Sequence, residues 1–283
     1  MRARAAILIA SLAAVSLAAQ TQTPTQTPQT PTVTQSPAQP AVVTPSTASS
    51  VPSCPELATA LTTLTRNDVR LRDWPQLLRY REQNRQLAAP AGSEARVVFM
   101  GDSITDAWPQ PRFGEFFVGK PYVGRGISGQ TTPQMLIRFR PDVLDLNPKV
   151  VVILAGTNDI AGNTGPMTDQ EIEGNIASMA ELARLHGVRV VLSSILPVSA
   201  YHVGLNGVPQ TTSRPMARIR AINDWMKKYA ADEKHVYLDY FPAMTDATGH
   251  LRTELSADDL HPNAQGYAIM GPLAEAAIKE ALR

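Results

Sequence analysis

From about residue 95 onward, short apolar runs rich in β-branched residues alternate with longer amphipathic segments. Five of these runs are typical of buried strands, at residues 96–100, 121–124, 150–154, 188–193 and 236–240. The segments between them carry apolar residues at helical spacing. Strands that alternate with helices form βαβ units, so the pattern predicts an α/β fold with a parallel sheet covered on both faces.

The clearest helical segment follows Thr168. Thr168 and Glu171 form a capping-box pattern, in which each side chain bonds to the backbone N–H of the other residue. The apolar residues that follow fall on one helical face: Ile172, Ile176, Met179 and Ala183. Gly187 stands where we expect this helix to end.

Further helices are expected on both sides of this one. Asp73 and Gln76 resemble another capping box, with Pro75 in the first turn. A second apolar stripe is more typical of core than of a cofactor site: Ile219, Ile222, Met226 and Tyr229. The last helix should begin near Pro262, and Pro272 should kink or break it.

The N-terminal part differs in composition from the rest. Arg2 and Arg4 precede an apolar stretch that ends in small residues, which suits signal-peptidase cleavage. The stretch is short for a membrane span, which needs about 20 residues. We therefore predict a signal peptide at residues 1–19, with an uncleaved N-terminal anchor as the alternative. Residues 20–53 are rich in Thr, Pro and Gln and contain no charge, so they should form a disordered linker. This linker is either a spacer from a surface or a tolerated tail.

The folded part should span residues 54–283, with a helical segment at 54–94 packed on a main domain at 95–283. Charge is balanced, with 26 Lys and Arg against 25 Asp and Glu and no basic run, so no nucleic-acid partner is expected. Cys54 is the single cysteine, which excludes an internal disulfide and leaves an intermolecular one or an idle thiol. No histidine or carboxylate pair has metal-ligand spacing, and no cofactor is expected.

Three residues that could take part in a reaction lie just beyond three of the expected strands. Ser103 ends the run Gly101-Asp102-Ser103, Gly129 lies in the next loop, and Asn158 follows the third strand. In parallel sheets, ligands bind beyond the carboxyl ends of the strands. A serine there is a helix cap or a nucleophile. A glycine lets a backbone N–H approach an anion, and an asparagine is a turn former or a neutral donor to an oxyanion.

A fourth polar element precedes the last helix, in the run Asp258-Asp259-Leu260-His261. A carboxylate three residues ahead of a histidine can fold back and accept the Nδ1–H of the ring. This fixes the tautomer and leaves Nε2 free to deprotonate a serine. The spacing favours Asp258 over Asp259, because immediate neighbours in a turn rarely face the same side.

Taken together, the four elements resemble the SGNH, or GDSL, hydrolase superfamily. The motifs FMGDSIT, GISGQTT, ILAGTND and DDLHPN are most similar to its bacterial branch related to platelet-activating-factor acetylhydrolase. The resemblance covers about residue 96 to the C-terminus. It implies a three-layer α/β/α fold with a flavodoxin-like, doubly wound, parallel five-stranded sheet.

The resemblance also implies the roles of the residues. Ser103 would be the nucleophile, His261 the base and Asp258 its orienting acid, and the oxyanion hole would combine Ser103, Gly129 and Asn158. Together with the predicted signal peptide, it implies an exported serine esterase, periplasmic or secreted from a bacterium, without a membrane span in its mature form. Its substrate would be a small-molecule or glycan ester with a short acyl group. A lysophospholipase, lipase or thioesterase is the alternative, and we expect the loop at 198–214 to line the substrate pocket.

Three rival functions are weaker. Gly124, Gly126 and Gly129 match a dinucleotide-binding GxGxxG, but they follow the second expected strand instead of the first. An α/β-hydrolase would need GxSxG, which occurs around no serine. A stalked carbohydrate-binding module would not need an aligned serine, histidine and aspartate.

Overall fold

The computed structural model describes residues 53–114, 116–202 and 207–283. The predicted signal peptide, and all of the predicted linker except residue 53, lie outside the described residues. In the part of the chain that is described, no helix is both long and apolar enough to span a bilayer.

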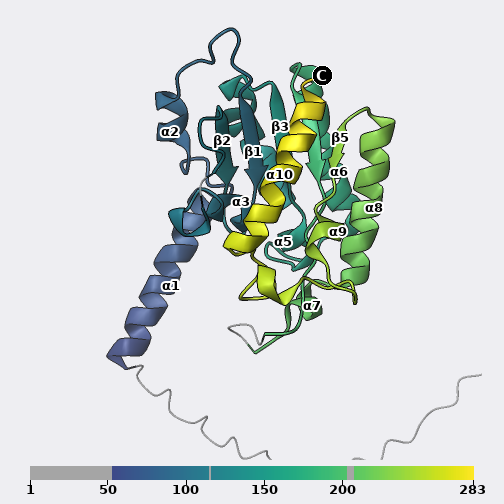
Figure 1. The fold of residues 1–283 in the computed structure, drawn as a ribbon. Coiled ribbons are helices and arrows are strands. Elements are labelled where there is room, and N and C mark those ends of the chain that lie inside the picture. The colour runs from purple at the N-terminus through teal and green to yellow at the C-terminus, as the bar shows by residue number, and fades with distance from the viewer. Residues whose placement is uncertain (1–52, 115, 203–206) are drawn as a thin grey trace, which may run out of the picture. The chain divides into compact units, whose positions relative to one another are not determined.

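A five-stranded parallel sheet forms the centre of the fold (Figure 1). Its strands are β1 (Val97–Gly101), β2 (Tyr122–Gly126), β3 (Val150–Leu154), β4 (Arg189–Ser193) and β5 (Val236–Leu238). They lie in the order β2-β1-β3-β4-β5, which is the doubly wound, flavodoxin-like order. The predicted α/β fold class is therefore confirmed, and each strand lies within or next to its predicted run.

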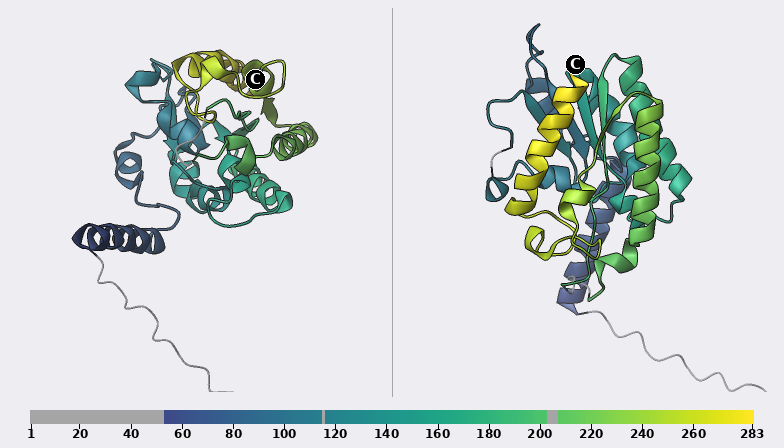
Figure 2. Two further views of the ribbon diagram at one scale, coloured as in Figure 1. Left: turned by 90° about the horizontal axis from the view of Figure 1, so that it is seen from below. Right: turned by 45° about the vertical axis from the view of Figure 1, so that its right-hand side comes forward.

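Helices cover the sheet on both faces. The described helices are α1 (Cys54–Arg72), α2 (Arg81–Gln86), α3 (Ser103–Ala107), α4 (Thr132–Asp142), α5 (Thr157–Ile160), α6 (Asp169–Leu185), α7 (Gln210–Ser213), α8 (Met216–Asp232), α9 (Phe241–Met244) and α10 (Ala264–Ala281), with short 3₁₀ turns at Pro111–Phe113, Leu144–Leu146 and Thr253–Leu255. In the right-hand view of Figure 2 the sheet lies between α10 (yellow) and α8 (green).

Each face of the sheet has its own apolar core. Val98, Val151 and Val190 pack under α4, α6 and α8, whereas Val97 and Val152 point to the other face and pack under α10. Alternate residues of a strand face opposite sides, so the strands read as continuous apolar runs. The predicted stripe on α6 is buried throughout, and its capping box forms, with Glu171 N–H bonded to Thr168 Oγ1.

One predicted helix start is wrong, and the last helix is not broken at its proline. Residues 73–80 form turns instead of a helix, and α2 begins only at Arg81; Asp73 accepts hydrogen bonds from the N–H groups of Leu77 and Leu78, while Gln76 has a positive φ of 56°. The last helix begins at Ala264, capped by Asn263, and runs through Pro272 without a break. The described side chains of α1 are exposed, including Leu61 and Leu64 at 65%.

Candidate active site

The carboxyl ends of three neighbouring strands bring the first site residues together. β1 pairs with both β2 and β3, so Gly101 lies opposite Gly126 and Leu154. Ser103 is the first residue of α3 after β1, and Asn158 lies in α5 after β3. Gly129 lies in the loop after β2 with φ of +80°, a conformation that favours glycine.

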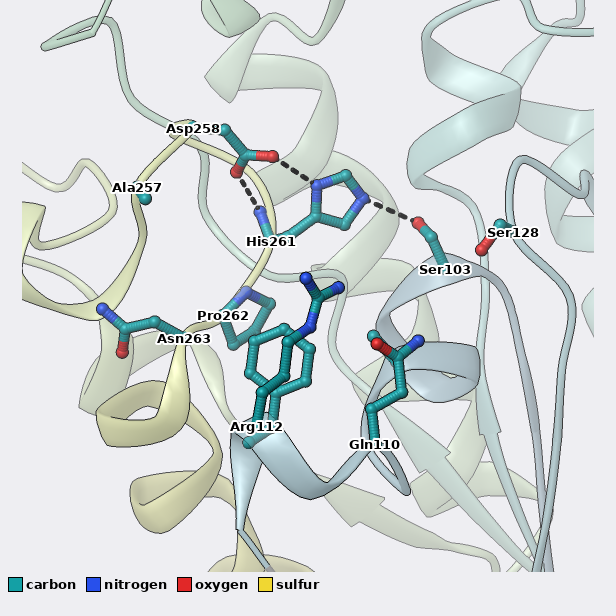
Figure 3. Close-up of a pocket in the computed structure, with 11 residues that line it drawn as sticks. Ser103, Gln110, Arg112, Ser128, Ala257, Asp258, His261, Pro262 and Asn263 are labelled. Atoms are coloured by element: carbon teal, nitrogen blue, oxygen red, sulfur yellow. Dashed lines mark hydrogen bonds and ion pairs between the residues drawn. The ribbon is translucent and has the colours of Figure 1, made fainter.

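Ser103, His261 and Asp258 form a continuous chain of hydrogen bonds (Figure 3). Ser103 Oγ lies 2.8 Å from His261 Nε2, and His261 Nδ1 lies 2.6 Å from Asp258 Oδ2. The serine is 158 residues from the histidine in sequence, so only the fold brings them together. With Nδ1–H donated to the carboxylate, Nε2 is the free acceptor that can take a proton from the serine.

Asp258 is held in its ionised form although it is partly buried. Burial alone raises the pKa of Asp258, but hydrogen bonds from the ring and the backbone N–H of His261 outweigh burial, and the pKa lies well below its ordinary value. The two bonds to His261 measure 2.6 and 2.8 Å, and the N–H of Leu260 adds a third. The carboxylate therefore orients the imidazole as a fixed anion.

The neighbouring carboxylate faces elsewhere. Asp259 has a positive φ of 65° and is buried, and its oxygens accept hydrogen bonds from Ser199 Oγ and from the ring and backbone N–H of His202. Asp259 thus anchors the loop after β4, and Asp258 is the carboxylate that contacts His261.

The serine turn is fixed by a cap and by close packing. Asp102 caps α3 by accepting the N–H of Ile104 at 3.0 Å, while its second oxygen is buried without a partner among the described residues. Burial raises the pKa of Asp102 to about 6. A Cβ on Gly126 would lie 2.1 Å from the backbone nitrogen of Asp106, so this glycine lets β2 pack directly against α3.

Three neutral donors lie in the segments that follow β1, β2 and β3. The backbone N–H groups of Ser103 and Gly129 have no hydrogen-bond partner in the described chain. Asn158 is 3% exposed, and its Nδ2 donates one bond, to the carbonyl oxygen of Gln130 at 3.0 Å. An amide nitrogen carries two N–H donors, so the second can meet a developing negative charge.

Arg214 supports this amide and was not identified from the sequence. The residue is 7% exposed, and its guanidinium donates to Thr157 Oγ1 at 3.1 Å, with Asn158 Oδ1 at 3.5 Å. Its other partners are the neutral Gln210 Oε1 and Ser213 Oγ, and it forms no ion pair with a carboxylate of the described chain, which is unusual for a buried cation. Arg214 lies at the end of a loop and belongs to no recognisable motif, so the sequence alone did not identify it as a residue near the site.

Asp106 is a second supporting residue that sequence patterns did not reveal. Its carboxylate accepts both the Oγ–H and the N–H of Ser128, at 2.7 and 3.2 Å, and pairs with Arg79 at 3.5 Å. Because Ser128 precedes Gly129, this contact fixes the loop that carries the glycine N–H.

A cleft of about 400 Å³ opens beside Ser103 and His261. Polar and apolar side chains share its walls: Gln110, Arg112, Ser128 and Asn263 with Ala107, Phe113 and Pro262. In Figure 3 the Arg112 guanidinium points into this space toward His261 and Ser103. None of the described residues of the loop at 198–214 lines this cleft; they contact Asp259 and Asn158, and residues 203–206 of the loop lie outside the described residues. That the loop lines the substrate pocket stays a prediction.

Among the described residues, no group of three His, Cys, Asp or Glu side chains could hold a metal ion. The histidine and carboxylates of the site are hydrogen-bonded to each other or to the backbone, as described above.

Comparison with known proteins shows the family of the chain. Residues 99–269 match the GDSL-like Lipase/Acylhydrolase family. A GDSL-like lipase of Bacteroides thetaiotaomicron has a solved structure that is 39% identical, with a TM-score of 0.67, covering 73% of this chain and 98% of the other. Esterase TesA of Pseudomonas aeruginosa is 30% identical over 59% of this chain and 79% of its own length.

A shorter match is with the uncharacterized lipoprotein YqeF of Bacillus subtilis, 38% identical over 76 residues. That match spans 26% of this chain and only 31% of the lipoprotein. The family match covers more than half of the chain and includes both Ser103 and His261. The chain therefore belongs to the GDSL-like lipase/acylhydrolase family, and it is a carboxylic ester hydrolase.

Proposed function

We propose that this chain is an exported serine esterase that removes short acyl groups, acetyl above all, from carbohydrate esters through an acyl-enzyme intermediate. The observation that carries the proposal is the 2.8 Å contact between Ser103 Oγ and His261 Nε2, backed by Asp258. A nucleophile bonded to a base that a carboxylate orients is the arrangement that acyl transfer requires.

In this mechanism, Ser103 Oγ attacks the ester carbonyl carbon while His261 Nε2 takes the hydroxyl proton. The carbonyl oxygen becomes an oxyanion, which accepts bonds from the N–H groups of Ser103 and Gly129 and from the Asn158 amide. Collapse of this intermediate breaks the ester C–O bond, and the imidazolium returns its proton to the leaving alcohol. Water then attacks the acyl-serine with His261 as base, releasing the acid and restoring Ser103.

The cleft at Ser103 favours a short acyl group and a polar alcohol. Its volume is about 400 Å³, near the low end of small-molecule sites. Gln110 and Arg112 line it alongside Phe113, and neither polar side chain has a hydrogen-bond partner in the described chain, so both can bind hydroxyl or anionic oxygens.

Arg112 also favours one alternative function, a lysophospholipase. Its guanidinium lies 4.5 Å from the centre of the Phe113 ring, and no carboxylate of the described chain pairs with it. A guanidinium free to bind two oxygens is suited to a phosphate. The length of the preferred acyl chain separates this alternative from the acetyl esterase.

The first prediction tests the reaction and its chain-length preference together. We expect the full chain to hydrolyse p-nitrophenyl acetate and butyrate faster than the palmitate ester, because the cleft is small. Ser103→Ala should lower kcat by roughly 10⁴-fold or more, because the nucleophile is lost. Spectrophotometric rates across the ester series measure this. Preference for palmitate would move the proposal to a lysophospholipase. A folded wild-type protein that hydrolyses none of these esters and does not react with a fluorophosphonate probe would refute the proposal.

The second prediction uses the adjacent carboxylates as a matched pair. Asp258→Asn should lower kcat by about 10⁴-fold, because the amide no longer stabilises the imidazolium or fixes its tautomer. Asp259→Asn should keep kcat within about tenfold of wild type, because that side chain makes no contact with His261. Both rates are normalised to the folded fraction measured by circular dichroism. Equal losses in the two variants would contradict the role given to Asp258.

The third prediction concerns the oxyanion donor. Asn158→Ala should lower kcat by roughly 10²–10³-fold with little change in KM, because the lost bond forms mainly in the transition state. Steady-state kinetics with p-nitrophenyl acetate measure both constants. A change in kcat below about threefold would remove Asn158 from this role.

The fourth prediction concerns export, which the charged and apolar N-terminal pattern and the similarity to a bacterial lipoprotein support. The full chain, produced in a Gram-negative bacterium, should be recovered outside the cytoplasm with a new N-terminus near residue 20. Cell fractionation with N-terminal sequencing measures this. Recovery from the cytoplasm with Met1 intact would contradict it.

A further inference from the structure

A second cleft adjoins the one at Ser103. It has a volume of about 320 Å³ and is lined by Trp74, Gln76, Ser128, Gly129, Gln134, Asn163 and Thr164. Ser128 lines both clefts, and Gly129 is one of the three proposed oxyanion donors. A substrate that extends past the oxyanion loop therefore enters this second cleft.

One wall of the second cleft comes from the turn at residues 73–77. Gln134 Nε2 donates to the carbonyl oxygen of Trp74 at 2.7 Å, and Gln130 Nε2 donates to that of Pro75 at 2.8 Å. Both Asp73 carboxylate oxygens accept backbone N–H groups of the same turn, at 2.8 and 2.9 Å. These bonds hold the turn against the start of α4, and Trp74 remains 40% exposed at the cleft.

The turn precedes residue 99, where the family match begins. Tyr80, a few residues further on, donates a hydrogen bond to the carbonyl oxygen of Gly126, and Arg125 bonds to Asn84 Oδ1 at 2.8 Å. The segment that carries Trp74 is thus fixed to β2 although it lies outside the matched region.

The chemistry of the lining is neutral and polar around one aromatic ring. None of the seven described lining residues is ionisable, so the cleft offers no cationic partner for a phosphate or carboxylate. Trp74 is the only large apolar residue among them, so a long acyl chain would lie against amides and hydroxyls. Burying apolar surface against such groups gives little stabilisation.

A sugar ring matches both features. It presents an apolar face of C–H groups that can pack on an indole, and its rim of hydroxyls both donates and accepts hydrogen bonds. The Gln76 side chain makes no hydrogen bond in the described chain, and Asn163 uses only Nδ2, which donates to Gly129 O at 3.1 Å. Both amides therefore keep donors or acceptors for hydroxyl groups.

We propose that this second cleft is a carbohydrate subsite that binds a neutral sugar unit next to the esterified unit held at Ser103. Trp74 is its stacking platform, and Gln76 and Asn163 bind hydroxyls. The proposal rests on the proposed esterase function and narrows its substrate to esters of oligosaccharides or longer glycans.

The test compares methyl glucoside that carries one O-acetyl group with methyl cellobioside that carries one O-acetyl group, so that the second ring of the disaccharide keeps its free hydroxyls. For the wild-type chain, kcat/KM should be higher for the disaccharide, because its second ring reaches Trp74. Trp74→Ala should reduce this disaccharide-to-monosaccharide ratio by roughly 5- to 10-fold, mainly through KM. Trp74→Phe should restore most of the ratio, because it keeps an aromatic face.

Leu78→Ala is the matched control, because Leu78 lies in the same segment, is 59% exposed and does not line the cleft. Its ratio should equal that of wild type. An unchanged ratio in Trp74→Ala, or an equal fall on both sugars and on p-nitrophenyl acetate, would overturn the subsite. A selective loss on p-nitrophenyl palmitate would overturn it in favour of an acyl channel. Loss of all hydrolysis by the wild-type chain would instead refute the esterase function itself.

Discussion

The parallel pairing of β1 with β2 and β3 is the constraint on which the site depends. With Gly101 opposite Gly126 and Leu154, three strands end level, and the residues that follow them meet at one edge. A slip of one residue in this register would turn every side chain of a strand to the opposite face. Val98 would then face the core that Val97 now occupies. Because packing in the two apolar cores opposes such a slip, it also keeps the strand ends, and the residues that follow them, in place.

The proposed acid and base are organised on a different principle. Asp258 and His261 are three residues apart, and one carboxylate accepts the ring N–H and two backbone N–H groups within the same turn. Their mutual orientation is thus local, and the fold has only to bring this preformed unit to Ser103. The proposed oxyanion donors require more of the fold, because Asn158, in α5, contacts Gln130 and Arg214 from two separate loops.

The sequence predicted what depends on periodicity and on short motifs. The five strands, the buried stripe on α6 and its capping box follow from spacing alone, and the four motifs located the residues now found at the strand ends. Predictions failed where a distant contact outweighs a local signal. Asp73, with Pro75 behind it, resembles a helix start, yet Gln130 and Gln134 hold that segment as a turn. Pro272 lies inside an uninterrupted α10. Arg214 carries no motif, and only the fold places its charge beside Asn158.

The turn that carries Trp74 is attached to the fold separately from the residues proposed to carry out ester hydrolysis. Its carbonyl oxygens are held by side chains of Gln130 and Gln134 and its N–H groups by Asp73, so the side chains of Trp74 and Gln76 are not needed to keep it in place. The residues proposed to break the ester bond lie at the carboxyl ends of the strands, whereas the turn at residues 73–77 lines the second cleft. Replacement of one or two turn residues is therefore a route by which a lineage can change the shape and chemistry of the second cleft while it keeps the same residues at the strand ends.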